Sequence, residues 1–181
     1  MVSIMKDLRA EHADIAKILD LVEQEIGALK AGGRPDYDLL EDIIDYCLNY
    51  PDQVHHPKED LVYRKLQIRN PKGAADVGDL QDLHDKLDAL TRRFAQAVDS
   101  VLLEAEMPRE RIEAIADEFV AAYREHLRME ETRFFPLAEE SLGPEDWAEI
   151  SMALSETADP LFGPVVANRY RDLKSELARL T

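Results

Sequence analysis

The chain has 181 residues, enough for one compact domain with a sizeable core, and its 22 basic and 38 acidic residues give a formal net charge of -16. This negative charge repels phosphate backbones and anionic lipid surfaces, so we expect neither nucleic-acid nor membrane binding. The single cysteine, Cys47, cannot form an internal disulfide, and no apolar run reaches signal-peptide or transmembrane length. We therefore expect a cytoplasmic protein.

Four amphipathic patterns follow one another along the chain, each with apolar residues three, four or seven positions apart. They run from Ile4 to Ile26, from Leu40 to Leu66, from Leu80 to Val101 and from Ile112 to Leu137. Breaks rich in glycine and proline separate them. No segment alternates with period two for long. The sequence therefore predicts an all-α fold, an antiparallel up-down-up-down four-helix bundle over residues 1–142.

Residues 143–181 carry two further helical patterns separated by breaks that contain proline. We interpret this segment as a C-terminal helical appendage that packs either on the bundle or on a second subunit. Its apolar residues Trp147, Phe162 and Val165 favour a homodimer as one possible arrangement.

Histidines interrupt the apolar face of all four predicted helices, and two of them are followed by a glutamate four positions later. Residues four apart on a helix project in the same direction, so each such pair presents an imidazole and a carboxylate together. Burying these groups without hydrogen-bond partners would cost on the order of several kcal/mol of folding free energy in total. The residues are His12, His55, Glu59, His84, His126 and Glu130.

The histidines also follow an internal repeat. His12 precedes His55 by 43 positions, and His84 precedes His126 by 42. The chain is thus interpreted as two helical hairpins, each contributing one histidine and one His-x-x-x-Glu pair. Such a set makes a site for two cations, with the glutamates able to bridge them. A metal-free histidine–glutamate network or a histidine pH switch is the alternative.

The ligand types favour iron, with manganese the less favoured alternative, because the set mixes nitrogen and oxygen donors and has no thiolate. Two six-coordinate ions have about twelve positions, of which these side chains fill about eight. About four positions are left for a solvent-derived bridge and a small exogenous ligand. Dioxygen, peroxide and nitric oxide suit such a site.

The residues His12, "HHPKE" at 55–59, His84 and "HLRMEETRFFP" at 126–136 resemble the hemerythrin-like, or HHE cation-binding, domain over about residues 1–142. The resemblance implies a four-helix bundle around a non-haem di-iron centre with an oxo or hydroxo bridge. It also implies that the six histidines and glutamates named above are the iron ligands. Members of this family bind dioxygen, sense oxygen, iron or redox state, or handle nitric oxide and peroxide.

The sequence differs from the oxygen carriers of the family that it resembles. Those carriers have a five-histidine site whose last motif is H-x-x-x-x-D. Here four histidines are in register and the ending is H-x-x-x-E. We therefore expect a protein that binds or senses dioxygen or a related small ligand. The alternatives are a di-iron oxidoreductase acting on peroxide or nitric oxide, and an iron-responsive interaction module. The ferritin-like di-iron pattern needs Glu-x-x-His pairs, which this sequence lacks.

His56 directly follows His55 and lies about 100 degrees further round the helix. We therefore expect it outside the ligand set, at the surface or behind a ligand. Pro51 and Pro57 flank this pair and predict a local departure from regular helix.

Two tyrosines, Tyr63 and Tyr123, lie along the same helix rows as the predicted ligands. Either hydroxyl is a candidate to donate a hydrogen bond to a bound oxygen species. Core packing is the alternative for both residues.

Overall fold

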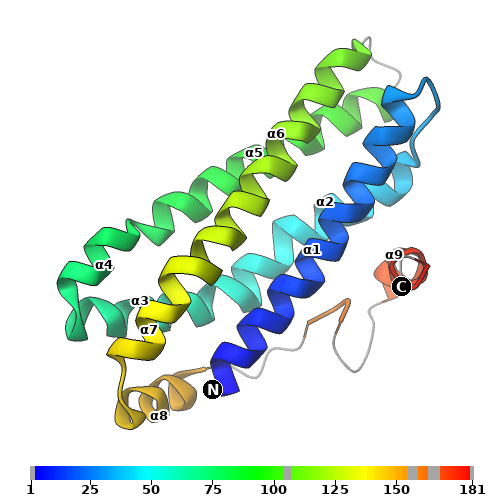
Figure 1. Ribbon diagram of the computed structural model, residues 1–181. Coiled ribbons are helices and arrows are strands. Elements are labelled where there is room, and N and C mark those ends of the chain that lie inside the picture. The colour runs from blue at the N-terminus through cyan, green and yellow to red at the C-terminus, as the bar shows by residue number, and fades with distance from the viewer. Residues whose placement is uncertain (1–2, 104–106, 155–158, 163–167, 180–181) are drawn as a thin grey trace.

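The computed structural model describes residues 3–103, 107–154, 159–162 and 168–179, and within these ranges all regular structure is helical. Four long helical segments form an antiparallel bundle in which α1 lies beside α2 and α6, and α5 completes the ring between α2 and α6 (Figure 1). The predicted all-α four-helix bundle is therefore confirmed. The segments are α1 (Ser3–Lys30), α2 (Tyr37–Tyr50) with η1 (Pro51–His55) and α3 (His56–Arg69), α5 (Leu80–Leu102), and α6 (Arg109–Met129) with η2 (Glu130–Phe134) and α7 (Phe135–Ser141).

Side-chain caps explain where several helices begin. Asp36 accepts a hydrogen bond from the first turn of α2, and Asp79 does the same for α5. Asn70 caps a short extra helix, α4 (Pro71–Val77), in a stretch that the sequence predicts as a simple break. This helix ends at Gly78, whose φ of 98° lies in the region that favours glycine.

Two of the long segments contain a π-helical turn close to the histidines and glutamates. In η1 the backbone N–H of His56 bonds to the carbonyl of Pro51, and in η2 that of Phe135 bonds to Glu130. A proline follows two residues after each turn, and a widened turn accommodates a ring that has no N–H to donate. The departure predicted near Pro51 is thus confirmed as a wide turn within a continuous helix.

The apolar core has two parts, one on either side of the polar residues. The upper core surrounds Leu19, Phe94 and Phe119, towards the α1–α2 turn. The lower core surrounds Leu8 and Phe134, towards the start of α1. His12 on α1 and His84 on α5 each lie between residues of the lower core and residues of the upper core. Packed apolar side chains therefore enclose the polar site from both ends of the bundle.

The C-terminal segment packs on the bundle, which is the first of the two arrangements predicted for it. Helix α8 (Pro144–Ala153) places Trp147 and Ile150 in the lower core, beside α3. Helix α9 (Arg171–Leu177), preceded by η3 (Asn168–Tyr170), places Leu173 in the upper core beside α1 and α2.

Burial of Trp147 within the chain removes it as support for a homodimer. Phe162 also packs on the upper core, and Val165 lies outside the described residues. The homodimer and the division of the chain at residue 142 stay predictions. Among the described helices, none is both long enough and apolar enough to cross a membrane.

Candidate metal centre

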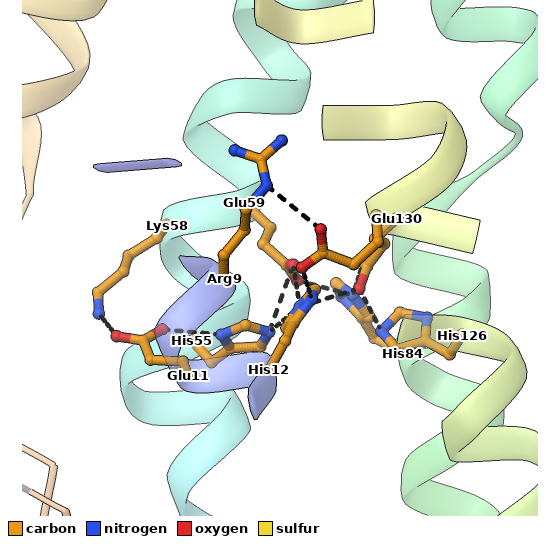
Figure 2. Close-up of polar contacts among 10 residues, drawn as sticks. Arg9, Glu11, His12, His55, Lys58, Glu59, His84, His126 and Glu130 are labelled. Atoms are coloured by element: carbon orange, nitrogen blue, oxygen red, sulfur yellow. Dashed lines mark hydrogen bonds and ion pairs between the residues drawn. The ribbon is translucent and has the colours of Figure 1, made fainter. Parts of the chain in front are cut away.

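The six histidines and glutamates predicted from spacing converge in the middle of the bundle (Figure 2). Every one of them is buried, and both glutamate side chains are completely shielded from solvent. Each long helical segment contributes at least one residue. His12 comes from α1, His55 from η1, Glu59 from α3, His84 from α5, His126 from α6 and Glu130 from η2.

The first half of the site consists of His12, His55, Glu59 and Glu130, whose candidate ligand atoms all lie within 4.8 Å of one another. The Nε2 atoms of His12 and His55 are 3.1 Å apart. The Nε2 atom of His12 lies 3.5 Å from Oε1 of Glu59 and 3.4 Å from Oε2 of Glu130. We call this set the tethered half, because carboxylates outside the cluster hold its two imidazoles.

The second half consists of His56, Glu59, His84 and His126, which also come within 4.8 Å of one another. The Nε2 atom of His84 lies 3.4 Å from Oε2 of Glu59. The Nε2 atom of His126 lies 3.2 Å from Oε2 of Glu130, so Glu130 faces this set as well. We call this set the open half.

The two glutamates lie between the halves. Oε1 of Glu59 faces His12 and His55, while its Oε2 faces His84. Glu130 turns Oε2 towards His12 and Oε1 towards His84. Each carboxylate can therefore reach a cation in either half, which is the arrangement of a bridging ligand.

The donor atoms fit a metal pair better than a hydrogen-bonded network. All four carboxylate oxygens of Glu59 and Glu130, and all four ring nitrogens of His84 and His126, are buried without a hydrogen-bond partner. Such groups are costly unless something satisfies them. Ligand atoms about 2.1 Å from one ion and at right angles lie about 3 Å apart, close to the spacing found here. The two adjacent groups thus fit a binuclear metal site.

Burial and mutual charge perturb the pKa values of the cluster strongly. Burial lowers the pKa of His126 to about 3. Burial also lowers the pKa of His55, but the charges and hydrogen bonds of Glu59 and Glu11 outweigh this effect and raise the pKa to about 10. Burial and the charge of Glu59 raise the pKa of Glu130 to about 8. Without cations the site therefore holds compensating protons, and bound cations would replace them.

In the first half, a carboxylate outside the cluster holds His55. Its Nδ1–H donates to Oε2 of Glu11 at 2.8 Å, and Lys58 in turn donates to Glu11. Because an ionised carboxylate can only accept a hydrogen bond, Nδ1 of His55 must carry the proton. The other ring nitrogen, Nε2, then directs its lone pair into the site.

His12 is held in the same way. Its Nδ1–H donates to Oε1 of Glu131 at 3.0 Å, and Arg9 donates to Glu131 and, with two hydrogen bonds, to Glu139. Sequence reasoning missed both tethers. The available signal was that a carboxylate directly precedes His12 and another directly follows Glu130.

The second half has no such tether on His84 or His126. Two surface pockets reach it instead. One, of about 290 Å³, reaches His56 and His84 past Asp60, Asp85 and Asp88. The other, of about 340 Å³, reaches His126 between α5 and α6 and has a largely apolar lining. The open half is named for these two pockets.

His56 is buried in the open half, which excludes the surface position, one of the two predicted for it. The other predicted position, behind a ligand, stays a prediction. The inward arc of a bundle helix spans more than about 100 degrees, so two consecutive residues can both face the interior. Here His55 approaches His12 of α1, while His56 stacks on His84 of α5.

Tyr63 does not lie at the site, which corrects its prediction as a hydrogen-bond donor to a bound ligand. Its hydroxyl donates to the backbone carbonyls of Gly78 and Ala74 and so joins α3 to the end of α4. Tyr123 is buried and packs against Phe119, one turn before His126. A role for Tyr123 beside a bound ligand stays a prediction.

The fold and the site together define a helical bundle built around two adjacent, buried groups of histidines and glutamates that fit a binuclear metal site. In agreement with this, the family model of the hemerythrin HHE cation binding domain matches residues 3–138. The match covers most of the chain, and the protein therefore belongs to the hemerythrin HHE cation-binding family, as the sequence resemblance predicts. No curated protein matches the sequence.

Proposed function

We propose that the chain is a non-haem di-iron protein that binds or senses dioxygen or a related small ligand such as nitric oxide or peroxide. The observation that carries the proposal is the pair of buried glutamates whose four carboxylate oxygens lack hydrogen-bond partners and face imidazoles on two sides. The residues proposed to hold the two ions are His12, His55, Glu59, His84, His126 and Glu130.

Iron is the favoured metal because the donors are imidazole and carboxylate, without thiolate. Cys47, the single cysteine, is buried in the upper core, and its sulfur is no part of either half. When bound, a pair of iron ions supplies redox activity and open coordination positions for a small ligand. The residues of the chain orient the imidazoles, bridge the two positions and exclude bulk water.

The apolar pocket supports an uncharged small ligand. It lies between α5 and α6 and ends at His126. An apolar wall offers no compensation for the lost hydration of an ion, whereas dioxygen and nitric oxide carry no charge to desolvate. The pocket is lined by Leu83, Leu87, Leu90, Ala122, His126 and Met129, together with the charged and exposed Lys86 and Glu125.

The proposal is tested by loading the purified protein with ferrous iron without air and measuring its metal content and optical spectrum. Two irons per chain and a reversible spectral change on adding dioxygen or nitric oxide support a binding or sensing role. Turnover of peroxide or nitric oxide well above that of free iron supports the oxidoreductase alternative instead. One zinc per chain, or no metal, contradicts the di-iron proposal.

The packing of α8 gives the interaction-module alternative a structural basis. Trp147 lies in the lower core beside α3, the helix that carries Glu59. Loading of the site could therefore alter the order of α8. Equal protease resistance of the metal-free and metal-loaded protein in residues 144–153 would remove this alternative.

A further inference from the structure

Three aspartates line the polar pocket of about 290 Å³ between α3 and α5. Asp60 comes from α3, and Asp85 and Asp88 come from α5. Among the described residues that line this pocket, none is a lysine or an arginine. The pocket therefore concentrates negative charge at one opening to the site.

The lining of the pocket changes from exposed carboxylates to a buried imidazole. Asp85 is exposed, Asp60 and Asp88 are half-buried, and His84 is only 3% exposed. Neither ring nitrogen of His84 has a hydrogen-bond partner. A buried and unpaired imidazole at the end of an acidic pocket offers a coordination position to a cation that enters there.

The register of α5 places two of the aspartates next to that imidazole. Asp85 directly follows His84, and Asp88 lies one helical turn after it. Gln81 donates a hydrogen bond from its Nε2 to Oδ1 of Asp85 at 3.0 Å, which restrains this exposed carboxylate. Asp60 completes the acidic lining from α3.

Two arginines at the surface offset part of this charge. Arg64 lies 3.9 Å from Asp60, and Arg92 lies 2.8 Å from Asp88. The two arginine side chains are 70% and 61% exposed, and exposed ion pairs of this kind are weak and screened by salt. A divalent cation can therefore compete for these aspartates, because it carries two charges and accepts oxygen ligands.

An ion that reaches the buried ligands must exchange its hydration shell for protein donors. Carboxylates compensate the lost hydration of a cation, whereas an apolar wall does not. The apolar pocket carries one acidic side chain, Glu125, whose charge Lys86 in the same lining offsets. Of these two pockets, the polar one is thus the better path for a cation.

We propose that the polar pocket is the entry site for the metal ions, where Asp60, Asp85 and Asp88 bind a hydrated divalent cation weakly and transfer it to His84. This inference rests on the proposed binding of iron by the six ligands. It assigns a different task to each pocket. The polar pocket admits the metal cation, and the apolar pocket admits the uncharged ligand.

A double variant that removes two charges without changing side-chain size tests this role. Asp85→Asn with Asp88→Asn neutralises the α5 side of the pocket. Asp82→Asn with Asp99→Asn is the matched control, because both residues are exposed on α5, outside the pocket lining, and the net charge changes equally. Circular dichroism of the metal-free proteins reports whether each variant folds.

Two rates are measured without air. For uptake, metal-free protein is mixed with ferrous iron, and a fast chromogenic chelator traps the iron that is still free after increasing delays. For release, iron-loaded protein is mixed with an excess of the same chelator. The ratio of the two rates gives the affinity of the site.

We expect uptake by the pocket variant to be at least about 10-fold slower, because a cleft lined by one sign of charge accelerates association about 10- to 1000-fold. Release should slow by the same factor, since the ion leaves by the same path. The final content of two irons and the affinity should then stay unchanged. The control should match the unchanged protein in both rates.

Uptake by the pocket variant at the rate of the control would overturn the inference. Slower uptake with unchanged release would also overturn it, because the variant would then have a weaker centre rather than a slower path. If the unchanged protein takes up no iron, the proposed function fails as well, so the two failures are distinguishable.

The dependence of uptake on salt gives a second readout. Because screening weakens the attraction of exposed charges, uptake by the unchanged protein and by the control should slow as the ionic strength rises. The pocket variant should show a smaller dependence. The same salt dependence in all three proteins would contradict an entry site formed by these aspartates.

Discussion

The tethered half and the open half differ in what stands behind their imidazoles. His12 and His55 each donate to a carboxylate outside the cluster, and a basic side chain pairs with each of those carboxylates. His84 and His126 have no hydrogen-bond partner on either nitrogen. One half is therefore preorganised, whereas in the other the imidazoles of His84 and His126 have no such anchor.

The two hairpins place their histidines and glutamates at similar spacings in the sequence, yet the two halves of the site that they form are not equivalent. Each hairpin supplies a histidine and a His-x-x-x-Glu pair. The carboxylates that anchor His12 and His55 come from positions that the repeat does not specify. The preorganised half is suited to hold its ion firmly. The half that the two pockets reach is suited to exchange its ion or to admit a small ligand.

The largest expected effect comes from removing a carboxylate that both halves share. Glu59→Ala deletes the two oxygens that face His12 and His55 on one side and His84 on the other, so we expect loss of both irons. Glu130→Ala should behave alike. Metal analysis after reconstitution checks this, with exposed Glu125→Ala on α6 as control. A Glu59 variant that retains one iron would show that the halves bind independently.

Removal of the metal is expected to have the next largest effect. A ligand present on the order of a thousandfold above its Kd stabilises the folded state by about 4 kcal/mol. For a chain of this size, its loss lowers Tm by about 10 °C. Calorimetry with and without a chelator measures the shift.

Hydrogen exchange of the metal-free protein sharpens the comparison between the halves. The tethers of His12 and His55 do not require metal, so amides around His12 in α1 should stay protected. Amides around His84 in α5 should exchange faster once the ions are removed. Equal loss of protection in both helices would contradict the division into a preorganised and a metal-dependent half.

A smaller effect is expected from cutting a tether. Glu11→Gln replaces the carboxylate that accepts from His55 with a neutral amide, and we expect the affinity for one iron to fall about 10- to 100-fold. Competitive titration against a chelator measures this. Glu41→Gln, an exposed change on α2, is the control. An unchanged affinity would mean that the contact between Glu11 and His55 does not orient the ligand.

The smallest effect is expected from narrowing the apolar pocket. Ala122→Leu adds bulk to its wall between α5 and α6 without replacing a proposed ligand. We expect slower binding of nitric oxide to the iron-loaded protein, with two irons still bound. Stopped-flow mixing measures the rate. An unchanged rate would show that the ligand reaches the centre by another path.

Much of this architecture could be predicted from the sequence because helix periodicity is a strong signal. Apolar steps of three and four defined the bundle, and histidines on those steps identified six residues that the structure brings together. The sequence left open whether His56 is exposed or buried, because periodicity gives the direction of a side chain but not the width of the interior arc.

Contacts between helices were the other part that the sequence could not supply. The tether from Glu131 to His12 joins residues 119 positions apart, and nothing in either local pattern specifies that pairing. Helix α4 was missed because its seven residues are too few for a clear apolar period, although Asn70 and Pro71 are typical of a helix start.

The central claim is that two unequal halves each hold one iron ion. Mössbauer spectroscopy of protein loaded with the Mössbauer-active iron isotope tests it most directly, because the method counts iron sites and distinguishes their surroundings. We predict two irons per chain that give two different signals of equal area. A single iron, or iron that gives signals unrelated to a coupled pair, would contradict the account.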